Sequence, residues 1–516
     1  MSESRIQNSL YNITSGLFAQ ILTIVLGFAV RTVFIYCLGK TYLGVSGLFS
    51  NILSILSFAE LGIGQAIIFS LYKPIAENDT EKIKSLMKLF EKIYRTLFFV
   101  VLGLGLAVLP FLKDIINDYD LIPNLDLIYV LYVINSAATY LFIYKSTFLT
   151  ACQKNYIVNL ISYIVSISVS VTQIIALLIF ENFIVYLAIQ ISFNIIQNIY
   201  VANRVDKLYP FFKDKTVAPL DKSIYQKIKK DVGALVIYKV GTLSLNSTDN
   251  IIISKFVGLI TVGSYSNYVL ITSSVSGCLS SIFGNITASV GNLNAKESDE
   301  KKYFMFKVIN LASFWLYSYV AICIFVLSNP FIGDCWLGES FLLDWKSVFI
   351  ICLNVYIGGM LYAPFQYRQT MGLFVQGKIR PIISAIENIV LSIILGKLYG
   401  LPGVLWGTAI TRLTTNGWYD PYIVFKHLGI SPLKYIVDYL LKIVLLFLIG
   451  GTCVYLSTLI LIDNIFKLIV AGLLLTLFIN LVYILIFYQS KEFLYLKDVM
   501  FMIIGKISHR MNRKTQ

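Results

Sequence analysis

Five basic side chains interrupt long apolar runs of this sequence: Arg31, Lys145, Lys239, Arg368 and Arg412. A fixed charge in apolar surroundings is unfavourable unless it faces water, a partner or a ligand. Arginine also presents a planar fork of donors that matches phosphate oxygens. The five positions therefore predict a water-accessible cationic cavity that binds an anionic substrate.

Three acidic residues occur in the same runs: Glu60, Asp249 and Glu387. Because three carboxylates cannot neutralise five cations, we predict a net positive cavity. A second interpretation stays open for each cation, which could instead snorkel to the membrane surface or pair with an acid for packing. The acids in turn either couple transport to H⁺ or Na⁺ or form structural pairs; we favour a structural pair for Glu387 and leave Asp249 open.

Uncharged polar residues accompany the cations at spacings of four and seven, which place residues on one face of a helix. We predict that these residues line the same cavity: Gln20, Gln190, Asn194, Asn246, Asn250 and Asn416.

The sequence contains an internal repeat. Gly39 and Gly44 recur, at one common offset, as Gly258 and Gly263. By the local offset further along the chain, Lys145 and Arg368 occupy equivalent positions. A repeat of this length in a membrane chain predicts a transporter whose site lies between the two copies.

Composition indicates that the solvent is a bilayer. Hydrophobic residues make up 57% of the chain and charged residues 14%, and the mean hydropathy is +0.76, which leaves too little polar surface for a soluble domain. Fourteen windows are long enough to span, and continuous apolar windows of this length predict α-helices. They lie at 10–37, 42–71, 95–113, 127–150, 156–180, 183–203, 232–256, 262–290, 308–332, 347–370, 380–398, 402–425, 437–461 and 465–488.

The predicted fold is an all-α integral membrane protein with two six-helix lobes. Six spans per copy is an even number, so the copies should be related by a parallel pseudo-two-fold axis. We expect an N-lobe at 1–210, a basic inner linker at 211–231, a C-lobe at 232–430, two further helices within 431–488 and a basic inner tail at 489–516. With both termini cytoplasmic, most Lys and Arg fall in inner loops, so the net charge of +14 reflects topology and not a nucleic-acid surface.

Motifs for catalysis or metal binding are weak. Gly377 and Lys378 have the spacing of a phosphate-binding loop, but Ile379 stands where Ser or Thr is needed. The seven cysteines show no paired spacing, which predicts neither a disulfide framework nor a metal site. Asp118 and Asp120 resemble a glycosyltransferase acid pair, although a solvated outer loop explains them as well. We therefore expect no enzyme, no catalytic residue and no cofactor beyond a coupling ion.

Four segments carry a resemblance to a known family: 31–44, 58–66, 151–154, and 247–250 with the glycines that follow it. They resemble the Wzx-type flippases of lipid-linked oligosaccharides, in the multidrug/oligosaccharidyl-lipid/polysaccharide flippase superfamily. The resemblance covers essentially the whole chain. It implies a V-shaped pair of bundles that carries an undecaprenyl-diphosphate-linked oligosaccharide from the inner to the outer leaflet of the bacterial cell membrane, for capsule or related surface polysaccharide.

By that resemblance Arg31 would hold the diphosphate, and proteins of polysaccharide assembly would be further partners. The roles of the other four cations rest on the cavity argument alone. Two other classes stay open: an ion-coupled multidrug extruder of the same fold, and a membrane-embedded polymerase or glycosyltransferase.

Overall fold

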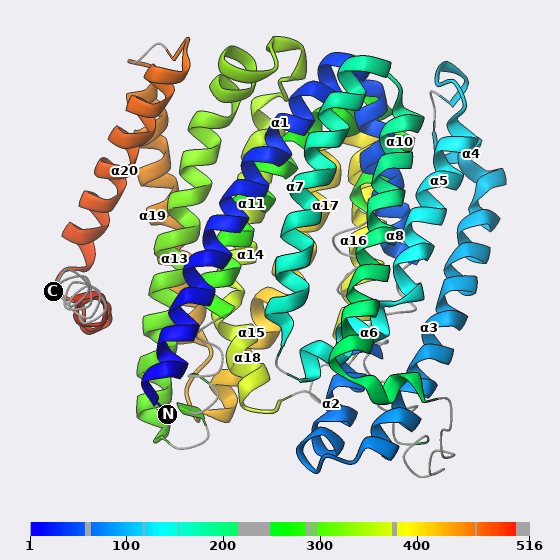
Figure 1. The fold of residues 1–516 in the computed structure, drawn as a ribbon. Coiled ribbons are helices and arrows are strands. Elements are labelled where there is room, and N and C mark those ends of the chain that lie inside the picture. The colour runs from blue at the N-terminus through cyan, green and yellow to red at the C-terminus, as the bar shows by residue number, and fades with distance from the viewer. Residues whose placement is uncertain are drawn as a thin grey trace, which may run out of the picture. The chain divides into compact units, whose positions relative to one another are not determined.

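The structure is a computed structural model that describes residues 2–56, 63–116, 119–152, 154–214, 248–284, 297–373, 379–459 and 462–501, with single positions at 226, 290, 293 and 294. Side chains are described from residue 22 onward, apart from a few single positions. Every regular element in these ranges is a helix (Figure 1).

The chain divides into two compact units. Unit 1 comprises Met1–Ser266 with Pro381–Ile389, and unit 2 comprises Asn267–Arg380 with Val390–Gln516. The predicted lobe boundary at 211–231 lies largely outside the described residues, so the predicted domain limits stay a prediction.

Unit 1 is built from the N-terminal helices. Its α-helices are α1 (Ser2–Leu56), α2 (Ile63–Ala76), α3 (Thr80–Val108), α4 (Leu112–Ile115), α5 (Leu125–Ala138), α6 (Ile143–Ala151), α7 (Asn155–Phe180), α8 (Phe183–Leu208), α10 (Asp249–Phe256) and the first turns of α11 (Leu259–Gly284). Short 3₁₀ turns lie at Leu109–Phe111, Tyr119–Leu121, Thr139–Leu141 and Pro210–Lys213. Within this unit α7 packs between α1 and α8, and α5 packs against α3 and α8.

Unit 2 continues from α11. Its further α-helices are α13 (Asp299–Pro330), α14 (Trp345–Met360), α15 (Tyr362–Thr370), most of α16 (Arg380–Tyr399), α17 (Leu401–Thr411), α18 (Gly417–His427), α19 (Leu433–Ser457) and α20 (Ile465–Phe487). Two π-helical segments occur at Phe331–Trp336 and Arg412–Asn416, and a 3₁₀ turn at Glu339–Phe341. The long helix α13 is central: α14, α15, α19 and α20 all pack against it (Figure 1).

Side-chain caps fix where several helices begin. Asp79 accepts a hydrogen bond from the Lys82 backbone N–H at the start of α3, 2.9 Å away, and Asn464 does the same for Lys467 at the start of α20. Such caps satisfy backbone donors that the first turn leaves unpaired. The starts of α3 and α20 are therefore encoded locally.

The chain is a multi-pass membrane protein. Nine helical stretches among the described residues are long and apolar enough to cross a bilayer, or ten if the pair Leu125–Leu141 and Ile143–Ala151, bent by 43°, forms one span. The prediction of fourteen spans is not confirmed. Window 232–256 lies mostly outside the described residues, window 42–71 is divided between α1 and α2, and window 402–425 is interrupted by the second π-helical segment.

Two glycines of the sequence repeat turn the chain in unit 1. Gly39 (φ 79°) bends α1, and Gly258 (φ 121°) separates α10 from α11. Residues with a side chain rarely adopt such φ values.

The next glycine of each copy then lies at a close crossing. A Cβ on Gly44 would overlap the Leu259 carbonyl, and one on Gly263 would overlap the Lys40 carbonyl. We call this backbone contact between α1 and α11, at Gly44 and Gly263, the glycine crossing.

Candidate functional site

Arg31 is the best-placed of the predicted substrate-binding residues. It lies within the apolar stretch of α1 and is half-buried. Its Nη2 donates to the Ser266 carbonyl at 3.0 Å, and its Nη1 to Ser266 Oγ at 3.3 Å. None of the ion pairs formed by the described residues includes Arg31. Within the part of the chain that the structure describes, the guanidinium therefore bonds to neutral groups, through two of its five N–H donors.

The glycine crossing explains how Ser266 reaches Arg31. Ser266 stands one turn beyond Gly263, to whose carbonyl its hydroxyl donates at 2.7 Å. Because α1 and α11 touch at backbone distance, a short serine on α11 can meet an arginine on α1.

Aromatic side chains pack beside Arg31 in unit 1. Phe34 makes edge contacts with Phe183 and Tyr186, with ring centroids 5.3 and 5.2 Å apart. Tyr132 and Tyr186 lie close enough to interact electrostatically with the guanidinium, and the Tyr132 hydroxyl donates to Ser46 Oγ at 2.8 Å. This low-dielectric wall strengthens the attraction of Arg31 for an anion.

Asn250 and Asp249 stand at the start of α10. Asn250 Nδ2 donates to the Gly47 carbonyl of α1 at 3.4 Å, while its buried Oδ1 has no hydrogen-bond partner in the described part of the chain. Asp249 is buried. An aspartate in the first turn of a helix is stabilised by the helix dipole.

Glu387 lies close to the same helix start. Thr248, just before Asp249, donates to Asn388 Oδ1 of α16 at 3.2 Å, and Asn388 directly follows Glu387. The two candidate coupling acids therefore flank a hydrogen-bonded pair within unit 1, a relation that their sequence separation gave no reason to expect.

Lys145 on α6 has a carboxylate partner. Its Nζ donates to both oxygens of Asp206 on α8, at 2.8 and 2.7 Å. The side chains are 16% and 27% exposed. This partner was absent from the sequence-based count of buried acids because Asp206 stands at the end of an apolar run.

Arg368 on α15 also has a carboxylate partner. Its Nε lies 3.2 Å from Asp420 Oδ1, and Arg380 Nη1 donates to the same oxygen. All three residues are buried. With Asp206 and Asp420 included, the excess of buried cations over buried acids is smaller than the sequence suggested. Lys145 and Arg368 each form an ion pair, which is the alternative that the sequence left open for every cation.

Arg412 opens the second π-helical segment of unit 2. Its Nη1 donates to the Asn354 carbonyl of α14 at 2.8 Å and lies beside Gly358. Asn416, which ends the segment, is half-buried. Single π-turns of this kind are common at functional sites.

The remaining predicted cavity residues divide in two. Asn194 Nδ2 donates to Asn135 Oδ1 at 2.8 Å between α8 and α5, and Gln190 is half-buried on α8. The side chain of Gln20, and residues Glu60, Lys239 and Asn246, lie outside the described residues. Among those that the structure describes, no group of three His, Cys, Asp or Glu side chains could hold a metal ion.

No protein-family model and no curated protein sequence matches the chain. Solved structures do. The lipid II flippase MurJ in an inward closed conformation aligns over 92% of this chain and 99% of its own, with a TM-score of 0.60 at 16% identity. An inward-facing multidrug resistance MATE transporter of the MOP superfamily aligns over 79% of this chain and 95% of its own, with a TM-score of 0.61 at 12% identity.

A third structure, the Vibrio cholerae MATE transporter VcmN in a bent form, covers 82% of this chain and 97% of its own, with a TM-score of 0.51 at 12% identity. All three are transporters and not enzymes. The chain therefore has the fold of MOP-superfamily transporters.

Proposed function

We propose that this protein flips an undecaprenyl-diphosphate-linked oligosaccharide from the inner to the outer leaflet of the bacterial cell membrane, by alternating access through a cationic cavity, for surface polysaccharide assembly. The observation that carries the proposal is Arg31, a half-buried cation in a membrane helix whose hydrogen bonds to the described residues go to Ser266. The fold shared with a lipid II flippase supports it.

A diphosphate needs such a group because moving its charge through about 30 Å of hydrocarbon is prohibitive without fixed compensating donors. Arg31 supplies a permanent charge and a donor fork, and its neutral partner Ser266 can be exchanged for phosphate oxygens with no loss of an ion pair. Arg412, bound to a backbone carbonyl, is the second candidate in unit 2. For Lys145 and Arg368 the ion pairs favour a packing role.

The lipid tail requires apolar surface, and unit 2 offers it. A cavity of about 410 Å³ lies among α13, α14 and α19, lined by apolar and aromatic side chains with Gly450 and Gly451. Beyond its chain neighbours and the backbone of its own helix, no atom of the described residues lies within 4 Å of where a Cβ of Gly451 would stand. We propose that part of the polyprenyl chain lies here while the headgroup is transferred.

The test is flipping of a fluorescent undecaprenyl-diphosphate-linked oligosaccharide by the purified protein in vesicles. Arg31→Ala should abolish flipping, and Arg31→Lys should retain part of it, since the charge remains but the fork does not. Arg95→Ala is the matched control, because Arg95 is an exposed arginine of α3. Wild-type flipping by Arg31→Ala would overturn the proposal.

A multidrug extruder is the second candidate function. The observation in its favour is the nearness of Asp249 and Glu387 to one hydrogen-bonded pair in unit 1, since buried acids suit ion coupling. Transport of cationic dyes that collapses on Asp249→Asn, together with no movement of the lipid-linked sugar, would establish this function in place of the first.

A further inference from the structure

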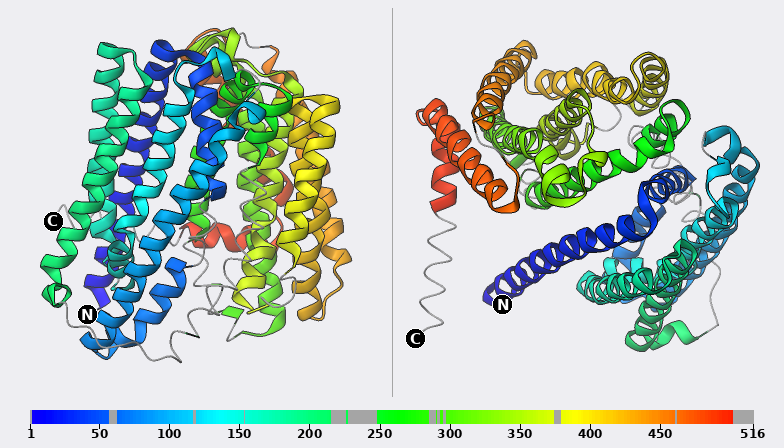
Figure 2. Two further views of the ribbon diagram at one scale, coloured as in Figure 1. Left: turned by 90° about the vertical axis from the view of Figure 1, so that its right-hand side faces the viewer. Right: turned by 90° about the horizontal axis from the view of Figure 1, so that it is seen from above.

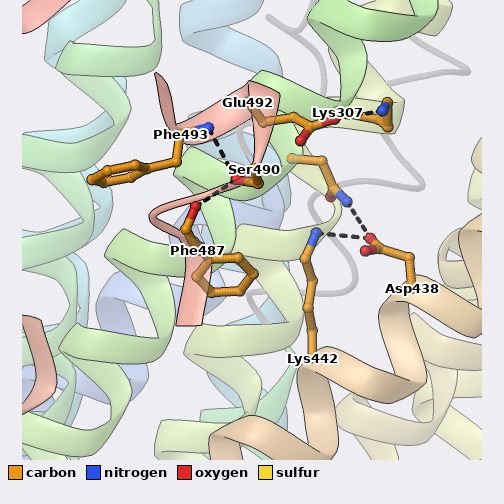
Figure 3. A network of polar contacts seen from close by, with 8 residues as sticks. Lys307, Asp438, Lys442, Phe487, Ser490, Glu492 and Phe493 are labelled. Carbon is orange, nitrogen blue, oxygen red and sulfur yellow. Dashed lines mark hydrogen bonds and ion pairs between the residues drawn. The ribbon is translucent and has the colours of Figure 1, made fainter. Parts of the chain in front are cut away.

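The chain forms one more helix after its last span. Helix α20 ends at Phe487, and residues 491–501 are helical again after a short turn. Ser490 makes the turn: its hydroxyl donates to the Phe487 carbonyl at 2.8 Å and accepts from the Phe493 N–H at 3.2 Å (Figure 3). The segment, here called the terminal helix, runs across the direction of α20: it is seen end-on in Figure 1 and from the side in the left view of Figure 2. A helix that runs across the axis of the span before it has the orientation of an interfacial helix.

One face of the terminal helix is docked on α13. Glu492 forms an ion pair with Lys307 (Figure 3). Phe493 stacks on Trp315 with ring centroids 5.7 Å apart, and Tyr495 meets the edge of Phe304 at 5.8 Å. These contacts fix which side of the helix faces the protein.

The opposite face is both apolar and basic. Leu494 and Phe501 are exposed on it, Phe501 by 64%, and Met500, two turns after Phe493, is 61% exposed in the last turn of the helix. Lys491 and Lys497 are exposed beside them, with Asp498 as the one acid of this face. Residues 502–516 add four basic side chains and no acid by sequence: Lys506, Arg510, Arg513 and Lys514.

We propose that the exposed face of the terminal helix binds the headgroups of anionic phospholipids at the membrane surface. Exposed Leu, Met and Phe side chains enter the boundary between headgroups and acyl chains, and the lysines meet lipid phosphates. Glu492 does not oppose this attraction because Lys307 neutralises it. The inference goes beyond the proposed function, since it concerns a surface outside the substrate site.

The probe is phosphatidylglycerol titrated into the full-length protein in a neutral detergent, with hydrogen exchange of residues 491–501 as the readout. Protection should saturate with phosphatidylglycerol and not with phosphatidylcholine. Each lysine near an anionic surface contributes about five-fold in affinity. The double variant Lys491→Gln with Lys497→Gln should therefore raise the phosphatidylglycerol concentration at half-saturation by about 25-fold. The matched control is Lys73→Gln with Lys88→Gln, two exposed lysines of unit 1, which should leave the titration unchanged.

A gain-of-affinity variant guards against a loss that comes from misfolding. Asp498→Asn removes the acid of the exposed face and should lower the phosphatidylglycerol concentration at half-saturation by about five-fold. Equal protection by phosphatidylcholine, no protection by phosphatidylglycerol, or unchanged affinity in both the double lysine variant and Asp498→Asn would overturn the proposal.

Discussion

Lys145 of α6 and Asp206 of α8 form a two-oxygen ion pair, with Nζ 2.8 and 2.7 Å from the carboxylate. Arg368, at the position equivalent to Lys145 in the sequence repeat, pairs with Asp420 of α18. Both cations therefore join a short helix to a later helix of their own unit. This favours a packing role for Lys145 and Arg368 and leaves Arg31 as the principal candidate for the diphosphate.

Removal of one member of the first pair should destabilise unit 1. Asp206→Asn leaves Lys145 charged and largely buried, and we expect a loss of about 1–3 kcal/mol, below the roughly 3–5 kcal/mol of a fully buried pair because both side chains are partly exposed. The measurement is the apparent melting temperature in detergent. Recovery of stability in Lys145→Met with Asp206→Leu would distinguish packing from substrate binding, whereas a stable Asp206→Asn that fails to flip would contradict this assignment.

The buried cluster in unit 2 should be more sensitive. Asp420→Asn removes the carboxylate shared by Arg368 and Arg380 and should cost about 3–5 kcal/mol, seen as loss of folded protein in detergent. Asp463→Asn is the control. Its partner Lys467 is a neighbour one helical turn away and both side chains are nearly half exposed, so solvent screens the pair and the change in stability should be small. Equal stability of the two variants would show that the cluster is not held as described.

The glycine crossing predicts a position-specific response to a single methyl group. Gly44→Ala and Gly263→Ala should destabilise the protein and impair transport, because each added Cβ meets a backbone carbonyl. In Gly103→Ala and Gly451→Ala the Cβ meets no packed atom of the described residues within 4 Å outside its own helix backbone, and replacement of a helical glycine should stabilise by up to about 1 kcal/mol. Melting temperatures of the four variants in parallel provide the test, and similar values would contradict the close contact.

Docking of the terminal helix should depend on pH in acid. Burial, the largest single influence, opposes ionisation of Glu492, but the hydrogen bond from Lys307, a backbone hydrogen bond and the charges of Lys307 and Lys442 together lower its pKa below the ordinary value of 4.5. A lowered carboxyl pKa contributes stability that is full above the unfolded value and is lost as pH falls through the folded value. Limited proteolysis of residues 491–501 should therefore increase below about pH 4.5 in the wild type. In Glu492→Gln the proteolysis of this segment should be high at every pH. If proteolysis of the wild type does not change with pH, the ion pair of Glu492 with Lys307 does not hold the terminal helix in place.

The sequence predicted the features that depend on local chemistry. Apolar windows identified most spans. The glycines of the repeat were interpreted only as a repeat, and the structure adds that Gly39 and Gly258 have positive φ. The sequence also singled out Arg31. The parallel relation of two lobes remains a prediction.

The partners of the cations could not be predicted from spacing. Asp206 stands 61 residues from Lys145 and is the last acid of an apolar run, a position that a solvated residue would also occupy. Arg380 is the first residue of α16 and carries no sequence sign that it shares Asp420 with Arg368. Whether two such residues meet depends on how each helix is rotated about its own axis. The periodicity of apolar residues in the sequence does not define this rotation closely enough to predict a pair.

The π-helical segment Arg412–Asn416 has a consequence for how this chain can vary. In it the Gly417 N–H bonds to the Arg412 carbonyl five residues back, so one turn holds one residue more than an α-helical turn. The segment can therefore lose one residue. Deletion of the exposed Leu413 should convert it to a regular α-helix without shifting α17 or α18 along their axes. The same deletion would rotate Arg412 relative to α18. Its hydrogen bond to the Asn354 carbonyl would then no longer be aligned. A chain shorter by one residue at this place should keep its fold and lose the orientation of its arginine.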